Sequence, residues 1–189
     1  MTEGSFETMA IFQTEFNMKN CNTFEMLNDD FKDKLYEMYF DHAKKMEGYK
    51  GIVLAYHTPT WRVNTDWLAK FGYKESDMAL MCEKSVNMLK DIRSKLSVPL
   101  IIRGLIGPKG DGYVVDQTTR MTPQEAEYYH MPIVYSLKNA GVDVITAASM
   151  IYPEEAAGVS AVCSRINIPY IITFILENSC LLPSGETLE

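Results

Sequence analysis

Four polar or glycine-rich segments each follow an apolar stretch of the chain, and they hold the residue types best suited to chemistry. They are Tyr56–Arg62, Ile106–Tyr113, Ala147–Tyr152 and Glu177–Cys180. In parallel α/β proteins, binding and catalytic groups occur in the loops that follow the carboxyl ends of the strands. We therefore expect the functional site to be built from these four segments.

The segment Gly107–Tyr113 (GPKGDGY) is the richest of the four in glycine. Successive backbone N–H groups in such a loop can hold an anion. Its spacing matches neither the phosphate-binding P-loop, which continues with Gly-Lys-Ser/Thr, nor the dinucleotide-binding fingerprint. A tight turn in which glycine supplies a positive φ is the simpler interpretation.

Histidines and carboxylates offer acid–base or metal-binding chemistry at few places. His57 can act as a general base or a metal ligand, but no second His or Cys lies at ligand spacing, which favours a hydrogen-bonded loop histidine. His130 follows two tyrosines on a predicted helix, where we expect it to pack and reach a hydrogen-bond partner. Glu177 directly follows an apolar stretch, and with Glu3 and Glu7 it either lines a polar pocket or is solvated at the surface.

Alternating apolar and amphipathic stretches predict the elements that position these loops. Near-continuous apolar runs suit strands that are buried on both faces of a parallel sheet. Such runs occur at Gly51–Tyr56, Val98–Ile106, Val142–Ala147 and Ile168–Leu176. Helical patterns occur at Phe31–His42 and Met78–Ile92, and two further helices are predicted to begin at Thr122-Pro123 and Pro153.

The alternation predicts an α/β protein, either an open flavodoxin-like sheet or a (β/α) barrel. Four strands in 189 residues favour the open sheet, because a closed eight-stranded barrel usually needs at least about 200 residues.

Composition excludes several classes of protein. The chain is 47% hydrophobic and 23% charged, which fits one globular domain. A net charge of -7 leaves no basic stripe for a phosphate backbone, so nucleic acid is not an expected partner. No apolar run reaches a membrane span of about 20 residues, and the N-terminus lacks the features of a secretion signal. Four isolated cysteines, none in a C-x-x-C pair, are typical of a reduced, cytoplasmic protein.

Six motifs in chain order resemble those of one protein family. They are EGSFET (Glu3–Thr8), PTWR (Pro59–Arg62), IGPKGDGY (Ile106–Tyr113), EAEYYH (Glu125–His130), TAASM (Thr146–Met150) and LPSG (Leu182–Gly185). On these motifs the chain resembles the homocysteine S-methyltransferase family, in particular a bacterial branch, over essentially its whole length.

The resemblance implies a zinc-dependent (β/α)8 TIM barrel that transfers a methyl group from a sulfonium or ammonium donor to the thiol of homocysteine, giving methionine. Its small-molecule partners are therefore homocysteine and a methyl donor. Family members hold zinc through three cysteines, and the metal keeps the substrate thiol as a thiolate. Zinc is expected for the family, but its ligands are not present in this chain, since Cys21, Cys82, Cys163 and Cys180 do not fall at the matching positions.

The resemblance also sets the expected extent of the fold. Residues 1–189 are predicted to form a single domain, a partial barrel that covers roughly strands 2–5 of the family fold and is incomplete at both ends. We expect it to be completed only in a longer chain or by a partner. Because a partial barrel exposes apolar strand faces and sheet edges, the isolated chain is expected to self-associate.

Matching the motifs gives the residues expected to contact substrate: Glu3, Gly4, Thr60, Trp61, Gly107, Gly110, Asp111, Tyr113 and Glu177. Glu3 and the backbone of Gly4 are expected to receive an ammonium group, and Trp61 to form an apolar wall facing a cationic donor. The loop glycines allow close backbone approach. Ala148 stands where related betaine-type enzymes have a glutamate, so one carboxylate contact is lost.

Two functions remain open from the sequence. The chain is either part of a methyltransferase that is catalytic only in a longer chain, or a non-catalytic short form that binds a small molecule or a partner without zinc. Both functions use the same substrate-contacting loops, and they differ in whether a metal is held.

Overall fold

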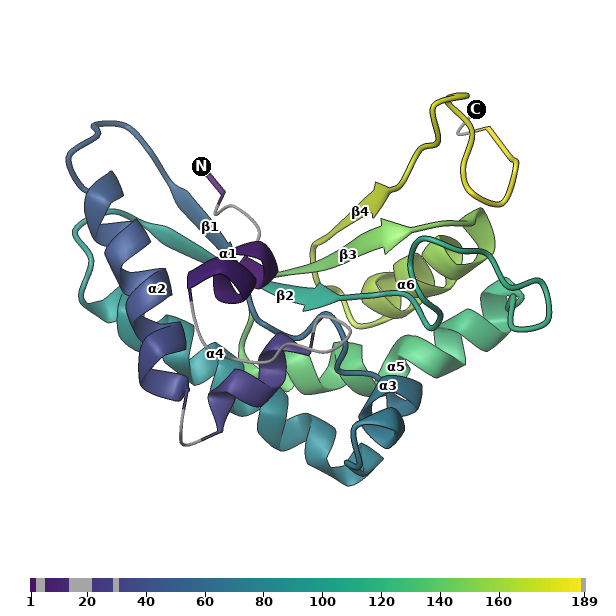
Figure 1. The fold of residues 1–189 in the computed structure, drawn as a ribbon, viewed down its shortest axis with the longest axis horizontal. Coiled ribbons are helices and arrows are strands. Elements are labelled where there is room, and N and C mark those ends of the chain that lie inside the picture. Colours follow the sequence, from purple (N-terminus) through teal and green to yellow (C-terminus); the bar gives the residue numbers. More distant parts are fainter. Residues whose placement is uncertain (3–5, 14–21, 29–30, 188–189) are drawn as a thin grey trace.

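Four parallel strands form one sheet in the structure, a computed structural model that describes residues 1–2, 6–13, 22–28 and 31–187 (Figure 1). The strands are β1 (Leu54–His57), β2 (Leu100–Ile106), β3 (Val144–Met150) and β4 (Tyr170–Phe174). Each strand overlaps the apolar run that predicts it, with its ends shifted by a few residues. The order is sequential, β1-β2-β3-β4, and each neighbouring pair is parallel.

Helices alternate with the strands as the amphipathic pattern predicts. The helices are α1 (Phe6–Gln13), α2 (Lys32–Met46), α3 (Thr65–Lys70), α4 (Met78–Ser94), α5 (Pro123–Ala140) and α6 (Pro153–Arg165), with 3₁₀ turns η1 (Thr23–Leu27) and η2 (Glu75–Asp77). The positions of α2, α4, α5 and α6 agree with the prediction, whereas the periodicity does not predict α1, α3 or the two 3₁₀ turns.

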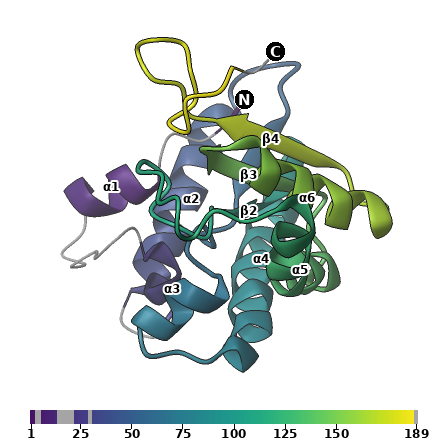
Figure 2. The same cartoon turned by 90° about the vertical axis from the view of Figure 1, so that its right-hand side faces the viewer.

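The strand order decides between the two architectures. A flavodoxin-like sheet changes strand order at a switch point and carries helices on both faces. Here the order is sequential, and α2, α4, α5 and α6 all lie on the lower side of the curved sheet in Figures 1 and 2. The open-sheet alternative is therefore wrong, and the partial TIM barrel is confirmed.

The core lies between the sheet and this helix layer. Leu54, Ile102 and Ile145 are fully buried on the strands and belong to one cluster with Leu89 of α4 and Val134 of α5. Burial of each such side chain contributes about 1.5–3 kcal/mol. The layer fixes the strands, and with them the carboxyl edge of the sheet from which the candidate loops emerge.

The predicted start of α5 is confirmed in detail. Thr122 accepts a hydrogen bond from the Glu125 N–H, and the Glu125 carboxylate accepts the Thr122 N–H in return. Gly141 ends the helix in the left-handed region, at φ 95°. This capping box stabilises the end of α5 at which the segment after β2 arrives.

The upper, concave side of the sheet exposes apolar side chains. Ile101 on β2 is 40% exposed and Ile171 on β4 is 43% exposed. Thr2 pairs with Ala55 along the outer edge of β1. Within the described part of the chain, no strand pairs with the outer edge of β4.

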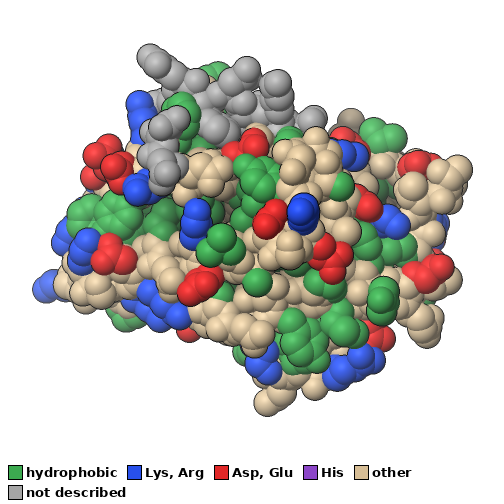
Figure 3. Space-filling model, turned by 90° about the horizontal axis from the view of Figure 1, so that it is seen from below, with side chains coloured by type: hydrophobic (Ala, Val, Ile, Leu, Met, Phe, Trp, Pro, Cys, Tyr) green, Lys and Arg blue, Asp and Glu red, His purple; other side chains and the backbone are tan. Residues whose placement is uncertain are grey.

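The outer surface of the helix layer carries mixed charge. In Figure 3, acidic and basic side chains are interspersed over this face rather than gathered into a field of one sign. None of the helices in the described ranges has the length and apolarity needed to cross a lipid bilayer.

Candidate functional site

Two loops meet at the carboxyl edge of the sheet. The glycine loop (residues 107–113) follows β2, and the segment of residues 58–64 follows the neighbouring strand β1. The segment 58–64 is buried throughout, whereas the glycine loop has exposed positions. The buried segment 58–64 therefore supports the glycine loop, and the glycine loop is the one that can meet a ligand.

Arg62 holds the far end of the glycine loop by its carbonyl groups. Its Nη1 donates to the Gly110 carbonyl oxygen at 3.0 Å, and its Nη2 donates to the Asp111 carbonyl oxygen at 2.7 Å. The guanidinium carbon lies 3.9 Å from the ring centroids of both Trp61 and Trp67. Such stacking fixes the plane of the guanidinium and hence the positions of the two carbonyl groups.

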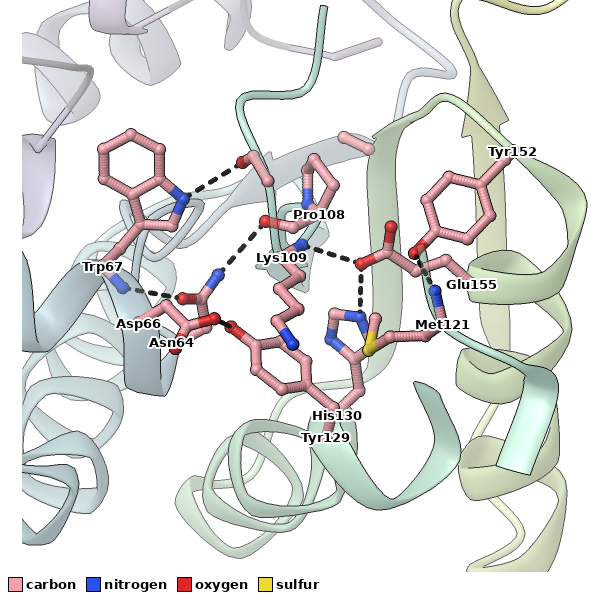
Figure 4. Close-up of polar contacts among 12 residues, drawn as sticks. Asn64, Asp66, Trp67, Pro108, Lys109, Met121, Tyr129, His130, Tyr152 and Glu155 are labelled. Atoms are coloured by element: carbon pink, nitrogen blue, oxygen red, sulfur yellow. Dashed lines mark hydrogen bonds and ion pairs between the residues drawn. The ribbon is translucent and has the colours of Figure 1, made fainter. Parts of the chain in front are cut away.

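Asn64 and Trp67 hold the middle of the same loop (Figure 4). Asn64 Nδ2 donates to the Pro108 carbonyl oxygen at 3.2 Å, and the Trp67 indole N–H donates to the Gly110 carbonyl oxygen at 3.1 Å. Asn64 Oδ1 also accepts the Trp67 backbone N–H at 3.0 Å, which caps the start of α3. The residues that begin α3 thus serve the loop as well.

Trp61 lies under the glycine loop and is nearly buried. Its indole N–H donates to the Ala148 carbonyl oxygen on β3 at 3.2 Å, and its ring meets Tyr113 edge-on at a centroid distance of 6.4 Å. Because Arg62 stacks on Trp61, the ring already holds a cation that belongs to the chain itself. Trp61 therefore joins the loops after β1, β2 and β3.

Gly107 has no room for a side chain. A Cβ at this position would lie 2.4 Å from the Trp61 carbonyl oxygen and 2.8 Å from the Trp61 indole. Gly112 has φ +95°, in the left-handed region, so it makes the turn at the other end of the loop. The tight-turn interpretation, in which glycine supplies a positive φ, is confirmed at Gly112, whereas Gly107 is a place of close approach to Trp61.

Thr58 and Thr60 tie the supporting segment to β2. The Thr60 hydroxyl donates to the Leu105 carbonyl oxygen at 2.6 Å, and the Thr58 hydroxyl accepts the Leu105 N–H at 3.0 Å. Both side chains are fully buried. In this structure the Thr60 side chain is not exposed to a ligand. Its role is to fix the position of its segment against β2.

A buried carboxylate holds the glycine loop from the opposite side. Glu155, in the first turn of α6, accepts the Lys109 N–H at 2.7 Å and the His130 ring Nε2 at 2.9 Å on the same oxygen, Oε1 (Figure 4). The prediction that His130 packs on a helix and reaches a hydrogen-bond partner is confirmed. The loop is therefore held between α3 on one side and α6 on the other.

Two tyrosines surround this carboxylate. The Tyr129 hydroxyl donates to Asp66 at 3.2 Å, and the Tyr152 hydroxyl accepts the Met121 N–H at 3.3 Å. Burial raises the pKa of both phenols, and the negative charges of Asp66 (on Tyr129) and Glu155 (on both) raise it further. Both phenols are therefore neutral hydrogen-bonding groups over the physiological pH range.

Two cavities flank Lys109. A cavity of about 460 Å³ is lined by Asp111 and Glu155 among others, and one of about 930 Å³ is lined by Tyr129 among others. Asp66 and Lys109 belong to both linings. The Lys109 side chain runs toward the Tyr129 ring, 5.1 Å from its centroid, and so points away from the exposed part of the glycine loop.

Two side chains of the glycine loop are exposed. The carbonyl groups described above and the Lys109 N–H are turned toward the body of the protein. Asp111 is exposed, and Tyr113 is 59% exposed. A ligand above this loop meets a carboxylate and an aromatic ring, a pair that suits a cationic group better than an anion.

A family model described as homocysteine S-methyltransferase matches residues 18–189. The chain belongs to the homocysteine S-methyltransferase family. The resemblance found in the six motifs is thereby confirmed. No curated protein matches the chain.

Solved structures show the same fold. The homocysteine methyltransferase MmuM from Escherichia coli in its metallated form aligns with a TM-score of 0.79 and 18% identity, over 99% of this chain and 66% of that chain. Its oxidized form gives 0.79 and 17%, over 99% and 65%. Its apo form gives 0.66 and 16%, over 99% and 62%. This chain thus spans about two thirds of the length of the family member it resembles.

The structure gathers most of the predicted site residues around the glycine loop. Gly107, Gly110, Asp111 and Tyr113 are part of it, and Trp61 packs beneath it. Glu177 lies in the exposed segment after β4, where its backbone bonds Leu181 and Cys180 rather than the glycine loop. Glu3 and Gly4 lie outside the described residues, so their roles stay predictions.

The metal that the family uses finds no fit among the described residues. No group of three or more His, Cys, Asp or Glu side chains there is placed to hold a metal ion. Cys82 and Cys163 are buried in the core and Cys180 is exposed, while Cys21 lies outside the described residues. Burial raises the pKa of Cys82 and of Cys163 to about 12, so both are protonated thiols rather than the thiolates that zinc binds.

Cys82 and Cys163 are accordingly expected to resist alkylation. When the native protein is treated with iodoacetamide at pH 8, peptide mass spectrometry should find Cys180 modified and the other two intact. In 8 M urea Cys82, Cys163 and Cys180 should all react, which controls for peptide detection. Modification of Cys82 at the rate of Cys180 in the native protein would contradict this burial.

Proposed function

We propose that this chain carries the substrate-binding loops of a homocysteine S-methyltransferase and binds homocysteine together with a methyl donor of the sulfonium or ammonium class. The observation that carries the proposal is the glycine loop, whose backbone is fixed from two sides while Asp111 and Tyr113 remain exposed. A fixed loop loses little conformational entropy on binding.

The chemistry of these side chains fits the proposed ligands. Asp111 offers a negative charge to an ammonium or sulfonium group, and the Tyr113 ring offers its π face. In the proposed transfer, the methyl carbon leaves the donor, whose sulfur or nitrogen keeps the bonding electron pair. The homocysteine sulfur forms the new bond and gives up its proton. The described residues would bind and orient the two reactants, which is a large part of such an in-line transfer.

Binding without catalysis is the second candidate function. It is favoured by one observation, that the described residues offer no group able to hold a metal. The two candidate functions involve the same ligands. They are distinguished by whether methylated homocysteine forms when both ligands are supplied together with zinc.

The proposal is tested by calorimetric titration of the chain with L-homocysteine and, separately, with the trimethylsulfonium ion. We expect both to bind, and Asp111→Asn to weaken trimethylsulfonium about tenfold, which corresponds to about 1.4 kcal/mol. Glu83→Gln, which removes an exposed carboxylate from α4, is the matched control and should bind as the parent does. Absence of homocysteine binding, or an Asp111→Asn variant with unchanged affinity, would overturn the proposal.

Glu3→Ala tests the remaining part of the predicted site. Loss of the carboxylate is expected to weaken binding of the amino acid homocysteine and to leave trimethylsulfonium binding unchanged. Unchanged homocysteine affinity would remove Glu3 from the site.

We also propose that the isolated chain self-associates through the concave face and the β4 edge. Ile171 lies on that edge strand and is half exposed. Light scattering is expected to give a mass above the 21.5 kDa of one chain, and Ile171→Lys to lower it. Leu80→Lys, at an exposed position on α4, is the control. A 21.5 kDa particle with sharp cooperative unfolding would count against association.

A further inference from the structure

Glu155 and His130 form a buried pair behind the glycine loop. The Glu155 side chain is 1% exposed and the His130 side chain is fully buried. Neither residue belongs to the loop, and neither contacts the exposed side chains Asp111 and Tyr113 by any hydrogen bond in the described structure. The pair meets the loop at one point, the Lys109 N–H.

The hydrogen bonds around the pair fix its geometry. A buried carboxylate is costly unless N–H or O–H groups donate to it. Glu155 Oε1 receives the Lys109 N–H, and it receives His130 Nε2 when that nitrogen carries the proton. The N-terminal end of α6 adds a favourable dipole. Among the described residues, His130 Nδ1 and Glu155 Oε2 are buried without a hydrogen-bond partner, so the pair is held through His130 Nε2 and Glu155 Oε1.

The Lys109 N–H is where this pair sets the shape of the loop. On the α3 side, Asn64 and Trp67 hold carbonyl oxygens on either side of Lys109, those of Pro108 and Gly110. On the α6 side, the Glu155 carboxylate is the group that holds a backbone N–H of the loop. Without it, the peptide unit between Pro108 and Lys109 is held only at its carbonyl oxygen, by Asn64, so we expect the loop that carries Asp111 and Tyr113 to be less firmly fixed.

We propose that Glu155, oriented by His130, is a positioning residue that sets the substrate-contacting conformation of the glycine loop through the Lys109 N–H. The link to substrate rests on the proposed function, whereas the link to loop conformation does not. The first can therefore fail while the second holds.

Both tryptophans of the chain report on this loop. Trp61 packs against Gly107 and Tyr113, and Trp67 donates to the Gly110 carbonyl oxygen. Quenching of tryptophan fluorescence by acrylamide therefore measures how tightly the loop covers them, without any ligand.

The test compares three variants in the ligand-free protein. Glu155→Ala is expected to raise the quenching constant at least twofold while far-UV circular dichroism is unchanged. Glu155→Gln keeps an oxygen that accepts from Lys109 and His130, and it should restore quenching to near the parent value. Glu154→Gln removes the neighbouring carboxylate of the same helix turn, which pairs with Arg120 instead, and should behave as the parent.

The outcomes separate cleanly. A folded Glu155→Ala with parental quenching, or a Glu155→Gln that quenches like Glu155→Ala, would overturn the proposal. If Glu155→Ala does not fold, His130→Phe decides, because it removes the orienting N–H: raised quenching supports the proposal and parental quenching overturns it. Homocysteine affinity, measured in parallel, should fall about tenfold in Glu155→Ala. If the parent itself binds no homocysteine, the proposed function fails, and quenching still decides the positioning role.

Discussion

Gly107→Ala is expected to lower the free energy of unfolding by about 3 kcal/mol, at the upper end of the range for overpacked sites. The new Cβ would lie 2.4 Å from the Trp61 carbonyl oxygen. That oxygen belongs to the backbone, so no side-chain rotation relieves the clash. Trp61 is also held by its hydrogen bond to Ala148, so the indole has little freedom to move away.

Gly110→Ala is the matched control for this prediction. It places the same methyl group in the same loop, where nothing lies within 4 Å of the new Cβ and φ is not in the left-handed region. Urea unfolding should give it a stability within about 1 kcal/mol of the parent. For Gly107→Ala, thermal unfolding should show a Tm lower by about 6–12 °C. Equal stabilities for the two variants would show that Trp61 does not pack against Gly107 as described.

Hydrophobic periodicity is enough to predict the layers of this fold. Strands and long helices follow from local patterns, and the start of α5 follows from Thr122 and Glu125, which lie within one turn. Strand order is not a local property. The apolar runs alone favoured an open sheet, and the partial barrel follows from the six family motifs instead.

The candidate site is predictable only in part, because its supports come from distant parts of the chain. The sequence marks Trp61 and the glycines, but it gives no sign that Trp67 and Arg62 converge on Gly110. Asn64 carries a local signal, as an N-cap residue before α3, though not for its bond to Pro108.

Two adjacent acids on α6 show the same limit. The sequence places Glu154 and Glu155 together at the positive end of a helix, where both are favourable. In the structure Glu154 pairs with Arg120 near the surface, and Glu155 is buried against Lys109 and His130. Which of the two faces inward depends on how α6 packs on α5, and that is set by contacts far apart in the sequence.

Arg62→Ala is expected to have an effect as large as Gly107→Ala, about 3–4 kcal/mol. The change leaves the Asp111 carbonyl group without its donor, at about 1–3 kcal/mol for an unsatisfied group, and it leaves the Gly110 carbonyl group with the Trp67 indole N–H alone. It also removes the cation between the rings of Trp61 and Trp67 and opens a gap there.

Arg62→Lys separates charge from geometry in this prediction. Lysine keeps the positive charge, but it lacks the planar fork that donates to two carbonyl groups while stacking between two rings, so it should recover less than half of the lost stability. Arg93→Ala is the control: its ion pair with Asp143 is exposed, and its loss should cost at most about 1 kcal/mol. Urea unfolding measures all three variants. If Arg62→Lys is as stable as the parent, charge alone holds the loop, and the stacked guanidinium is not what fixes Gly110 and Asp111.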